Sequence, residues 1–574
     1  MKNSIGTFLA KANNDENVWI DDVREAFSKE NGFNRIILRL FLLDGTIRDY
    51  PVPIPGYSNK EEYRFLKDYL TASVFNILSV FSGTELQIYY DMKAPDVSLL
   101  IDDVLSSFDD IPGLHKPVNI AGRLCRALNL STFAFAKEDL RNYKEHEAKN
   151  EISSETPGLS SKILAAVKAA EKGLYVGLDI GGTDIKAVLS KKGKLLAVKE
   201  YDWNPMLFKT AEELMNPIYL ITNLLRAYAG SCDYPVSPEF QTVSRAMRKE
   251  ATDHEMLEAY MAAVSLPLLN GIGISFPDVV IKNKILGGET PKTKGIRENK
   301  DADYNKELSE LAELGERLKK ACTRDAKVNI INDGSMSAFS TVCENIYLNP
   351  DQVASSAVAY SLGTDLGTGW IRKDGTIPGI PLECYDMITD IGSYVSGKYE
   401  SEDIRSVKNE NSGLQGCRRY LGQAAAYRLI EKSEPELIHD FATEENGIIK
   451  IKSVPQDMRK PCLEHIMSAA ENGDAKAEEV FRQIGINLGH LTSELEHIAD
   501  TGAGSRSLFG RFVKKPHCFE LLKEGFSEVV PEITLEAADD SMACTPLMKQ
   551  LSEREDVTVA QFAQAVSAVY YSLM

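Results

Sequence analysis

The alternation of apolar and polar residues divides this chain into a shorter N-terminal part and a longer remainder. In the N-terminal part, Arg35–Tyr50 contains two β-rich runs joined by an Asp-Gly pair, and Leu66–Phe81 has the spacing of an amphipathic helix. The polar stretch Lys137–Ser160 becomes rich in Ser, Thr, Pro and Gly, a composition typical of linkers. We therefore predict a self-contained α/β domain over residues 1–150 and a linker over residues 151–172.

The remainder contains two similar units in which an apolar strand enters a turn rich in Gly and Thr and leaves as another strand. The first unit begins with Leu174–Ile180 and the second with Ala357–Leu362, about 185 residues further on. Two such units indicate a duplicated lobe, with each half presenting a hairpin tip to a shared cleft. Two unrelated β-turns would give the same pattern, so the spacing alone leaves both interpretations open.

The first of these turns, with the sequence DIGGTDIK, has the composition of a phosphate-binding loop. Gly181 and Gly182 lack the Cβ that would keep backbone N–H groups away from a phosphate, and Thr183 adds a hydroxyl donor. Asp179 is placed to hold Mg²⁺ through water, and Lys186 could reach a phosphate as a point charge. The alternative is a tight turn that needs glycine dihedral angles, but the full octet after an apolar strand favours phosphate.

The second turn, GTDLGTG, combines three glycines with two threonines in seven residues. This density suits a loop that clasps the outer phosphates of a nucleotide from the opposite lobe. A glycine-rich hairpin packed against a neighbouring backbone would have the same composition, and both interpretations stay open. The candidate phosphate ligands of this turn are Gly363, Thr364, Gly367, Thr368 and Gly369.

A third element, VNIINDGSMSAF, is an apolar strand followed by Asn332, Asp333 and a helix start rich in small residues. A carboxylate at the carboxyl end of a strand can accept the proton of a hydroxyl group that attacks a phosphoryl group. Asn332 can donate and accept hydrogen bonds with a polyhydroxylated substrate. On these residues alone, however, a helix N-cap is the favoured role for Asp333.

Composition and charge narrow the class of protein. The 574 residues carry 65 Lys+Arg and 84 Asp+Glu, a net charge of −19, which opposes nucleic-acid binding but not a nucleotide held by local backbone dipoles. The nine cysteines are dispersed without a CxxC pair, which indicates reduced thiols. No apolar run is long enough to span a membrane and the N-terminus is a poor secretion signal, so we expect a cytoplasmic protein without a membrane partner.

Taken in order, four segments resemble the ROK family of bacterial sugar kinases and sugar-responsive repressors, part of the actin/hexokinase/Hsp70 ATPase superfamily. They are DIGGT-x-IK-x-x-L from Asp179, GIGIS-x-P from Gly271, IINDGSMSA from Ile330 and LGTDLGTGW from Leu362. The resemblance runs from about Leu174 to the C-terminus. It implies an α/β, two-lobed actin-like ATPase (ribonuclease H-like) fold after the extra N-terminal α/β domain, with ATP and a sugar between the lobes and Mg²⁺ bridging the phosphates.

The resemblance also implies roles for individual residues. Asp333 matches the general base and Asn332 a sugar ligand, while the glycines and threonines of the two turns match the phosphate loops. The first lobe is then expected over residues 173–345, closed by a terminal helix at 556–574, and the second lobe over residues 346–555.

The chain departs from the family pattern around the sugar. Family members usually carry a Gly-His pair and a CxCGxxGC cluster that binds zinc, but no histidine lies between residues 255 and 438, so we predict no zinc site. Glu289 and Glu383 are the expected further substrate ligands, the second on a loose alignment. Asp278 stands where a glycine usually follows proline and would change the sugar pocket, so glucose should not be assumed. Gly510 is the candidate for the adenosine loop, with a packed strand-turn at least as consistent.

These features lead to two principal hypotheses. The first is an ATP-dependent carbohydrate kinase that transfers the γ-phosphate to a sugar hydroxyl, with Asp333 as general base and Mg²⁺ as cofactor. The second is a non-catalytic regulator or sensor that responds to sugar and nucleotide, and a chaperone-like ATPase is a third. Residues 1–150 carry 18 Lys+Arg and 22 Asp+Glu, which is unfavourable for DNA binding. The expected partners are a small-molecule sugar and ATP, with a homodimer left open.

Overall fold

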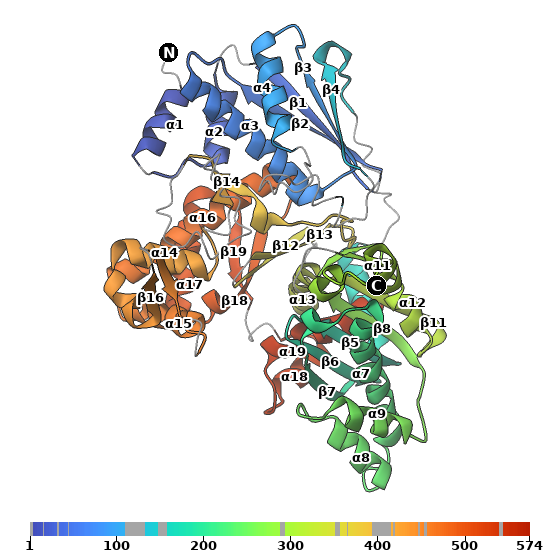
Figure 1. Cartoon of the computed structure of the whole chain (residues 1–574). Coiled ribbons are helices and arrows are strands. Elements are labelled where there is room, and N and C mark those ends of the chain that lie inside the picture. The colour runs from blue at the N-terminus through green and yellow to red at the C-terminus, as the bar shows by residue number, and fades with distance from the viewer. Residues whose placement is uncertain are drawn as a thin grey trace.

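Figure 1 shows the computed structural model of the chain, in which an N-terminal domain adjoins the second of two lobes and the first lobe lies on the far side of that second lobe. Every helix in the described part of the chain is too short or too polar to cross a bilayer. The structure describes residues 4–14, 16–30, 34–43, 45–108, 125, 132–146, 158–287, 293–350, 356–363, 366–392, 415–416, 420–445, 448–452, 456–538 and 543–574.

The N-terminal domain is built on a four-stranded sheet of order β2-β1-β3-β4. The predicted hairpin is the antiparallel pair of β1 (Asn34–Phe41) and β2 (Ile47–Ile54), and β3 (Glu85–Tyr90) pairs in parallel with β4 (Ala134–Asp139). In the described part of this domain the sheet is accompanied by α1 (Ser4–Asn13), α2 (Ile20–Ser28), α3 (Lys60–Phe81) and α4 (Pro95–Ser106).

Helix α3 joins the N-terminal domain to the second lobe. Every residue from Tyr69 to Phe81 is buried, so the helix is enclosed on all sides over this part. Its neighbours include the N-terminal sheet on one side and α16 (Ala475–Ala499) and β14 (Ile388–Asp390) on the other. The N-terminal domain and the second lobe therefore share one hydrophobic core instead of forming separate ones.

The first lobe contains a five-stranded sheet of order β11-β8-β5-β6-β7. Its antiparallel meander is β5 (Leu174–Ile180), β6 (Asp184–Lys191) and β7 (Lys194–Asp202). β8 (Leu269–Phe276) and β11 (Cys322–Asn332) run parallel to β5 on its other side. This strand order is that of the ribonuclease H fold. The helices between these strands are α7 (Ala211–Ser231), α8 (Pro238–Ala246), α9 (Asp253–Met261), α10 (Lys294–Arg297), α11 (Tyr304–Ala312) and α12 (Leu314–Lys319).

The second lobe repeats the arrangement, and no third meander strand is found among its described residues. Its sheet has the order β13-β12-β18-β19, in which β12 (Ala357–Leu362) and β13 (Leu366–Ile371) are antiparallel and β18 (Ser505–Gly510) and β19 (Thr534–Ala537) are parallel to β12. The two-lobed ribonuclease H-like fold with an added N-terminal region is therefore confirmed. The remaining elements here are α14 (Gln423–Ser433), α15 (Arg459–Glu471), α17 (Pro516–Val529) and hairpins of β14 with β15 (Gln415–Gly416) and of β16 (Ala442–Glu445) with β17 (Ile448–Ile451).

Four further helices of the described chain lie between or behind the lobes. α13 (Asp333–Leu348) leaves β11 of the first lobe and packs on β12 and β13 of the second. α19 (Val559–Tyr571), preceded by α18 (Pro546–Ser552), packs on the first-lobe sheet. Residues 159–170 of the expected linker instead form α6 (Leu159–Ala170), whose apolar side packs against α13 and α19.

Glycines allow α19 to lie directly on the first-lobe sheet. A Cβ at Gly177 of β5 would lie 1.8 Å from the carbonyl oxygen of Ala565, and a Cβ at Gly273 of β8 would lie 1.7 Å from that of Ala568. No side chain fits at either position. The same close approach holds β5 and β8 against a common support.

Candidate active site

The polar residues singled out in the sequence gather where the parallel strands of the first lobe end. Asp179 is opposite Ser275 in the pairing of β5 with β8, and Asn332 is opposite Phe276 in the pairing of β8 with β11. Adjacent strands lie about 4.8 Å apart. The carboxyl edge of a parallel sheet is the usual position for ligand sites in α/β folds.

The carboxylate of Asp179 belongs to a cluster of charges at this edge. Burial raises the pKa of Asp179 to about 6; a hydrogen bond from Ser275 and the charge of Lys186 lower it, and the charges of Asp333 and Asp184 raise it. Ser275 of β8 pairs with Asp179 of β5 on one side and with Ile331 of β11 on the other, so the first glycine turn and the start of α13 lie at the same edge of the sheet. Two of the three segments on which the sequence hypothesis depends are thus brought together.

Lys186 is engaged by an acid that the sequence analysis did not single out. Its ammonium group forms an ion pair with the carboxylate of Asp184, and the two side chains are 16% and 21% exposed. The ammonium group that we predicted to reach a phosphate therefore already has a carboxylate partner. The i, i+2 spacing on one face of β6 was the signal that could have revealed this pair.

The first glycine turn is closed partly by its own hydrogen bonds. The N–H of Gly181 donates to the carbonyl oxygen of Asp184 (2.8 Å), and the carbonyl oxygen of Gly181 accepts from Nε1 of Trp203 (3.0 Å). A Cβ at Gly181 would lie 2.7 Å from that oxygen of Asp184, so glycine is required by the turn itself. Gly182 and Thr183 are exposed at the tip, where a phosphate could approach them.

Asn332, not Asp333, caps helix α13. Its Oδ1 accepts hydrogen bonds from the N–H groups of Gly334 (2.9 Å) and Ser335 (3.4 Å), and its Nδ2 donates to the carbonyl oxygen of Asp278 (3.0 Å). The capping role that the sequence favoured for Asp333 is therefore wrong by one residue. The same bonds compete with the sugar contact that we predicted for Asn332.

Asp333 is the first residue of α13 and is half-buried. Its Oδ1 accepts a hydrogen bond from the N–H of Gly334 (2.8 Å), and an anionic side chain is stabilised by the positive end of a helix dipole. A carboxylate held in this way, next to Asp179 and at the edge of the sheet, can accept a proton from a bound hydroxyl group.

The second glycine turn is fixed against the start of α13 by contact between backbones. A Cβ at Gly369 would lie 1.9 Å from the carbonyl oxygen of Gly334, and a Cβ at Gly334 would lie 2.4 Å from that of Thr368. Packing against a neighbouring backbone therefore explains Gly369. The side chain of Thr368 is buried beside the thiol of Cys384.

The tip of the second turn is more open than its base. Gly363 has no atom near the position of a Cβ, and Gly367 is exposed. Thr364 lies outside the described residues. Gly510 ends β18 beside Leu362, with φ +117°, and a Cβ there would lie 2.1 Å from the carbonyl oxygen of Leu362. Its glycine is thus explained by packing, and its location next to the second turn is compatible with the expected nucleotide contact.

Glu383, one of the two expected further sugar ligands, is bonded through its backbone to the N-terminal domain. The N–H of Glu383 donates to the carbonyl oxygen of Ser79 (3.2 Å), and Oγ of Ser79 donates to the carbonyl oxygen of Glu383 (2.7 Å). These bonds fix the backbone of Glu383 to α3 of the N-terminal domain. Glu289 lies outside the described residues. Asp278, by contrast, is buried next to Asn332.

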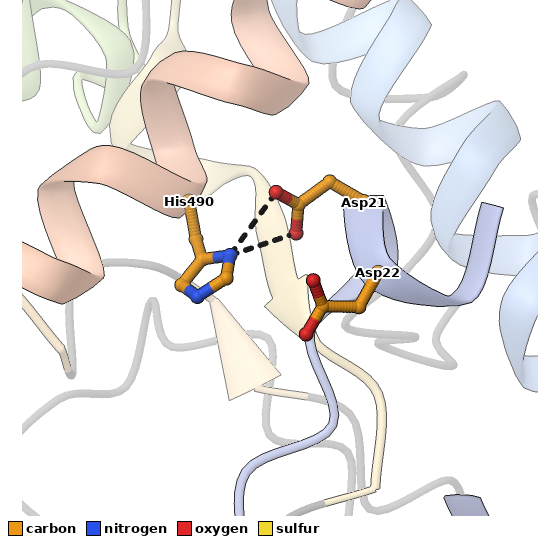
Figure 2. A group of neighbouring side chains, drawn as sticks. All are labelled: Asp21, Asp22 and His490. Atoms are coloured by element: carbon orange, nitrogen blue, oxygen red, sulfur yellow. Dashed lines mark hydrogen bonds and ion pairs between the residues drawn. The ribbon is translucent and has the colours of Figure 1, made fainter. Parts of the chain in front are cut away.

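Carboxylate oxygens are the ligands that Mg²⁺ prefers, and Asp179 fits that role. Its pKa is raised by burial and by two neighbouring carboxylates, so a bound cation would relieve repulsion there. A different group, Asp21, Asp22 and His490, is the one cluster of three metal-ligand side chains found among the described residues. Figure 2 shows these residues at the junction of α2 with α16, where Nδ1 of His490 lies 3.0 Å from both carboxylate oxygens of Asp21.

The sequence matches no protein-family model and no curated protein. Solved structures that align with the chain include a ROK family glucokinase from Streptomyces griseus in complex with glucose and AMPPNP (18% identity, 69% of this chain and 98% of that one, TM-score 0.36). ROK hexokinase from Thermus thermophilus aligns at 15% identity over 69% of this chain and 98% of its own, with a TM-score of 0.37. A ROK family transcriptional regulator, a homologue of the E. coli MLC protein, aligns at 14% identity over 70% and 80%, with a TM-score of 0.37.

Proposed function

We propose that this chain is an ATP-dependent carbohydrate kinase with Asp333 as its general base. The observation that supports the proposal is the position of Asp333 at the start of α13, next to Asp179 of the first glycine turn and fixed against the second turn through Gly334 and Gly369. In this proposal the glycine turns of the two ribonuclease H-like sheets would face one carboxylate.

The chemistry follows from positioning and charge. Oδ of Asp333 would accept the proton of the sugar hydroxyl as that oxygen attacks the γ-phosphorus of ATP, and the bond to the β,γ-bridging oxygen breaks. The exposed backbone of Gly182 and Thr183 on one side, and of Gly367 with the half-buried Gly363 on the other, would bind the phosphates. Mg²⁺ held through Asp179 would offset the negative charge of the triphosphate.

The experiment is a panel of sugars screened for ADP release with Mg·ATP. Asp333→Asn keeps the size of the side chain and its hydrogen bond from Gly334, so we expect it to fold and to lose more than about a hundredfold in turnover. The matched control is Asp325→Asn, an exposed acid on the same strand β11, which should keep wild-type turnover. Normal turnover in Asp333→Asn would exclude the proposed base, and ADP release that ignores every sugar would favour an ATPase.

A regulator that binds sugar without catalysis is the second candidate, and the ion pair of Lys186 with Asp184 favours it. A lysine that is neutralised within the protein has less attraction for a phosphate than an unpaired one. The same panel separates the two functions. Thermal stabilisation by a sugar, with no release of ADP from ATP in the presence of any sugar of the panel, would support the regulator and exclude the kinase.

A further inference from the structure

A cavity lies in the first lobe, away from the glycine turns. Its volume is about 360 Å³, and it is enclosed by α7, α9, α12 and the segment that follows α12. Pockets for small molecules begin at about 300 Å³. The polar residues that line this one are Tyr219, Thr222, Asn223, Arg226, Tyr260, Arg317 and Lys320.

The cavity is at the opposite end of the sheet from the candidate active site. The lining residue Ala321 directly precedes β11, and Pro267, which bonds to the lining residue Arg226, lies just before β8. The candidate active site lies at the other ends of these strands. The eight residues of β8 span roughly 23 Å at about 3.3 Å per residue, so a small ligand cannot touch both places.

All three charged side chains that line the cavity are cationic, in a chain whose net charge is −19. Of these, Arg226 makes hydrogen bonds with neutral acceptors: Nε and Nη2 donate to the carbonyl oxygens of Pro267 (3.0 Å) and Leu266 (2.9 Å), and Nη1 donates to Oδ1 of Asn223 (2.8 Å). Burial lowers the pKa of Arg226. Within the described ranges, no carboxylate pairs with Arg226 or with Lys320.

Acids are present only on the neighbouring surface. A shallow groove that shares Arg317 and Lys320 with the cavity is also lined by Glu310, Glu313 and Glu316. Of these acids, Glu310 contacts a cation of the cavity, at 3.4 Å from Nη2 of Arg317, where both side chains are 36% exposed. Contacts of this kind between exposed groups contribute little. Neither Arg226 nor Lys320 therefore forms an ion pair with an acid in the described part of the chain.

We propose that this cavity binds the anionic group of a small metabolite, a phosphate or a carboxylate, between Arg226, Arg317 and Lys320. A half-buried guanidinium group without a counterion is costly, and an anion in the cavity removes that cost. Arginine and lysine are the usual partners of both anions, and Tyr219 and Tyr260 line the same space. The inference concerns a site outside the catalytic cleft and does not depend on the kinase proposal.

The test is calorimetric titration of the full chain with inorganic phosphate in one arm and citrate in the other, without nucleotide. Lys320→Gln removes an exposed charge without disturbing the core, and it should weaken binding of the preferred anion by about fivefold or more. Lys319→Gln removes the same charge one residue earlier, outside the lining, and should change affinity less than about twofold. The double variant Arg317→Gln/Lys320→Gln should abolish binding.

Hydrogen exchange locates the bound anion independently of affinity. Phosphate or citrate should protect residues 219–226 and 317–321 and leave residues 181–186 unchanged. Stronger binding of phosphate would identify a phosphorylated ligand, and stronger binding of citrate a carboxylate ligand. The proposal is overturned if neither anion binds, if the double variant binds like wild type, or if protection is confined to residues 181–186.

Discussion

Replacing Asp179 by asparagine tests whether the ionised carboxylate at this position lowers the free energy of unfolding. Burial, together with the charges of Asp333 and Asp184, raises its pKa from 3.8 to about 6, despite a hydrogen bond from Ser275 and the charge of Lys186. Between these two pH values the folded protein binds more protons at Asp179 than the unfolded chain does. The free energy of unfolding therefore falls as pH rises through this window. A shift of about two pKa units, at about 1.4 kcal/mol each, lowers the free energy of unfolding by about 3 kcal/mol at pH 8 relative to acid pH. At pH 5 the free energy of unfolding is lowered by about half as much.

Asparagine resembles the neutral acid, so Asp179→Asn should recover this free energy. We expect its melting temperature at pH 8 to exceed that of wild type by on the order of 5 °C, with a smaller difference at pH 5. Differential scanning fluorimetry in EDTA, without nucleotide, measures this, and Asp325→Asn is the matched control. The same variant should lose Mg²⁺-dependent sugar phosphorylation. A melting temperature below that of wild type at pH 8, or the same difference at both pH values, would refute the reasoning.

Two further substitutions test the packing that positions the site. Gly273→Ala should detach α19 from the first-lobe sheet because its Cβ would lie 1.7 Å from the carbonyl oxygen of Ala568. The rate of hydrogen exchange in α19 should therefore rise. The control Gly315→Ala, whose Cβ would have no atom closer than 3.5 Å, should leave that rate unchanged. Asn76→Ala removes the hydrogen bond that the buried carboxylate of Glu494 accepts at 2.9 Å, a loss of about 1–3 kcal/mol. It should speed proteolysis between the N-terminal domain and the second lobe, and an unchanged digestion rate would show that this bond is not needed there.

Local elements of the fold were predictable where an apolar run is bounded by glycine. Leu174–Ile180 and Ala357–Leu362 are the bounds of β5 and β12 as well as of the predicted strands. This pattern could not predict the order of strands across each sheet, because hydrophobic periodicity does not show which strands pair with one another. The family resemblance supplied the strand order. The expected linker failed at α6, whose apolar residues Leu159, Ile163 and Val167 repeat at helical spacing.

The candidate site was predictable as a set of segments but not as a set of contacts. Asn332 and Asp333 are both good N-cap residues, and the backbone dihedral angles that decide between them are not visible in the sequence. Glycine in the turns had two explanations for the same reason. In the structure, close contact with a neighbouring backbone explains glycine at Gly181 and Gly369, whereas Gly182 and Gly367 are exposed. Which glycines fall in each group depends on the backbone that lies opposite them, and the sequence does not show this.

The contacts between the N-terminal domain and the second lobe bear on which parts of the proposed kinase can move relative to one another. Besides the shared core, Asn76 of α3 exchanges hydrogen bonds with the backbone of Ile388 (2.7 and 2.9 Å), and Arg24 of α2 forms an ion pair with Glu494, a carboxylate only 1% exposed. Separating these surfaces would leave buried polar groups without partners, which costs several kcal/mol. We therefore predict that the N-terminal domain and the second lobe move as one body. In the proposed kinase, closure would then take place between this body and the first lobe, which are connected by α13 with Asp333 as its first residue.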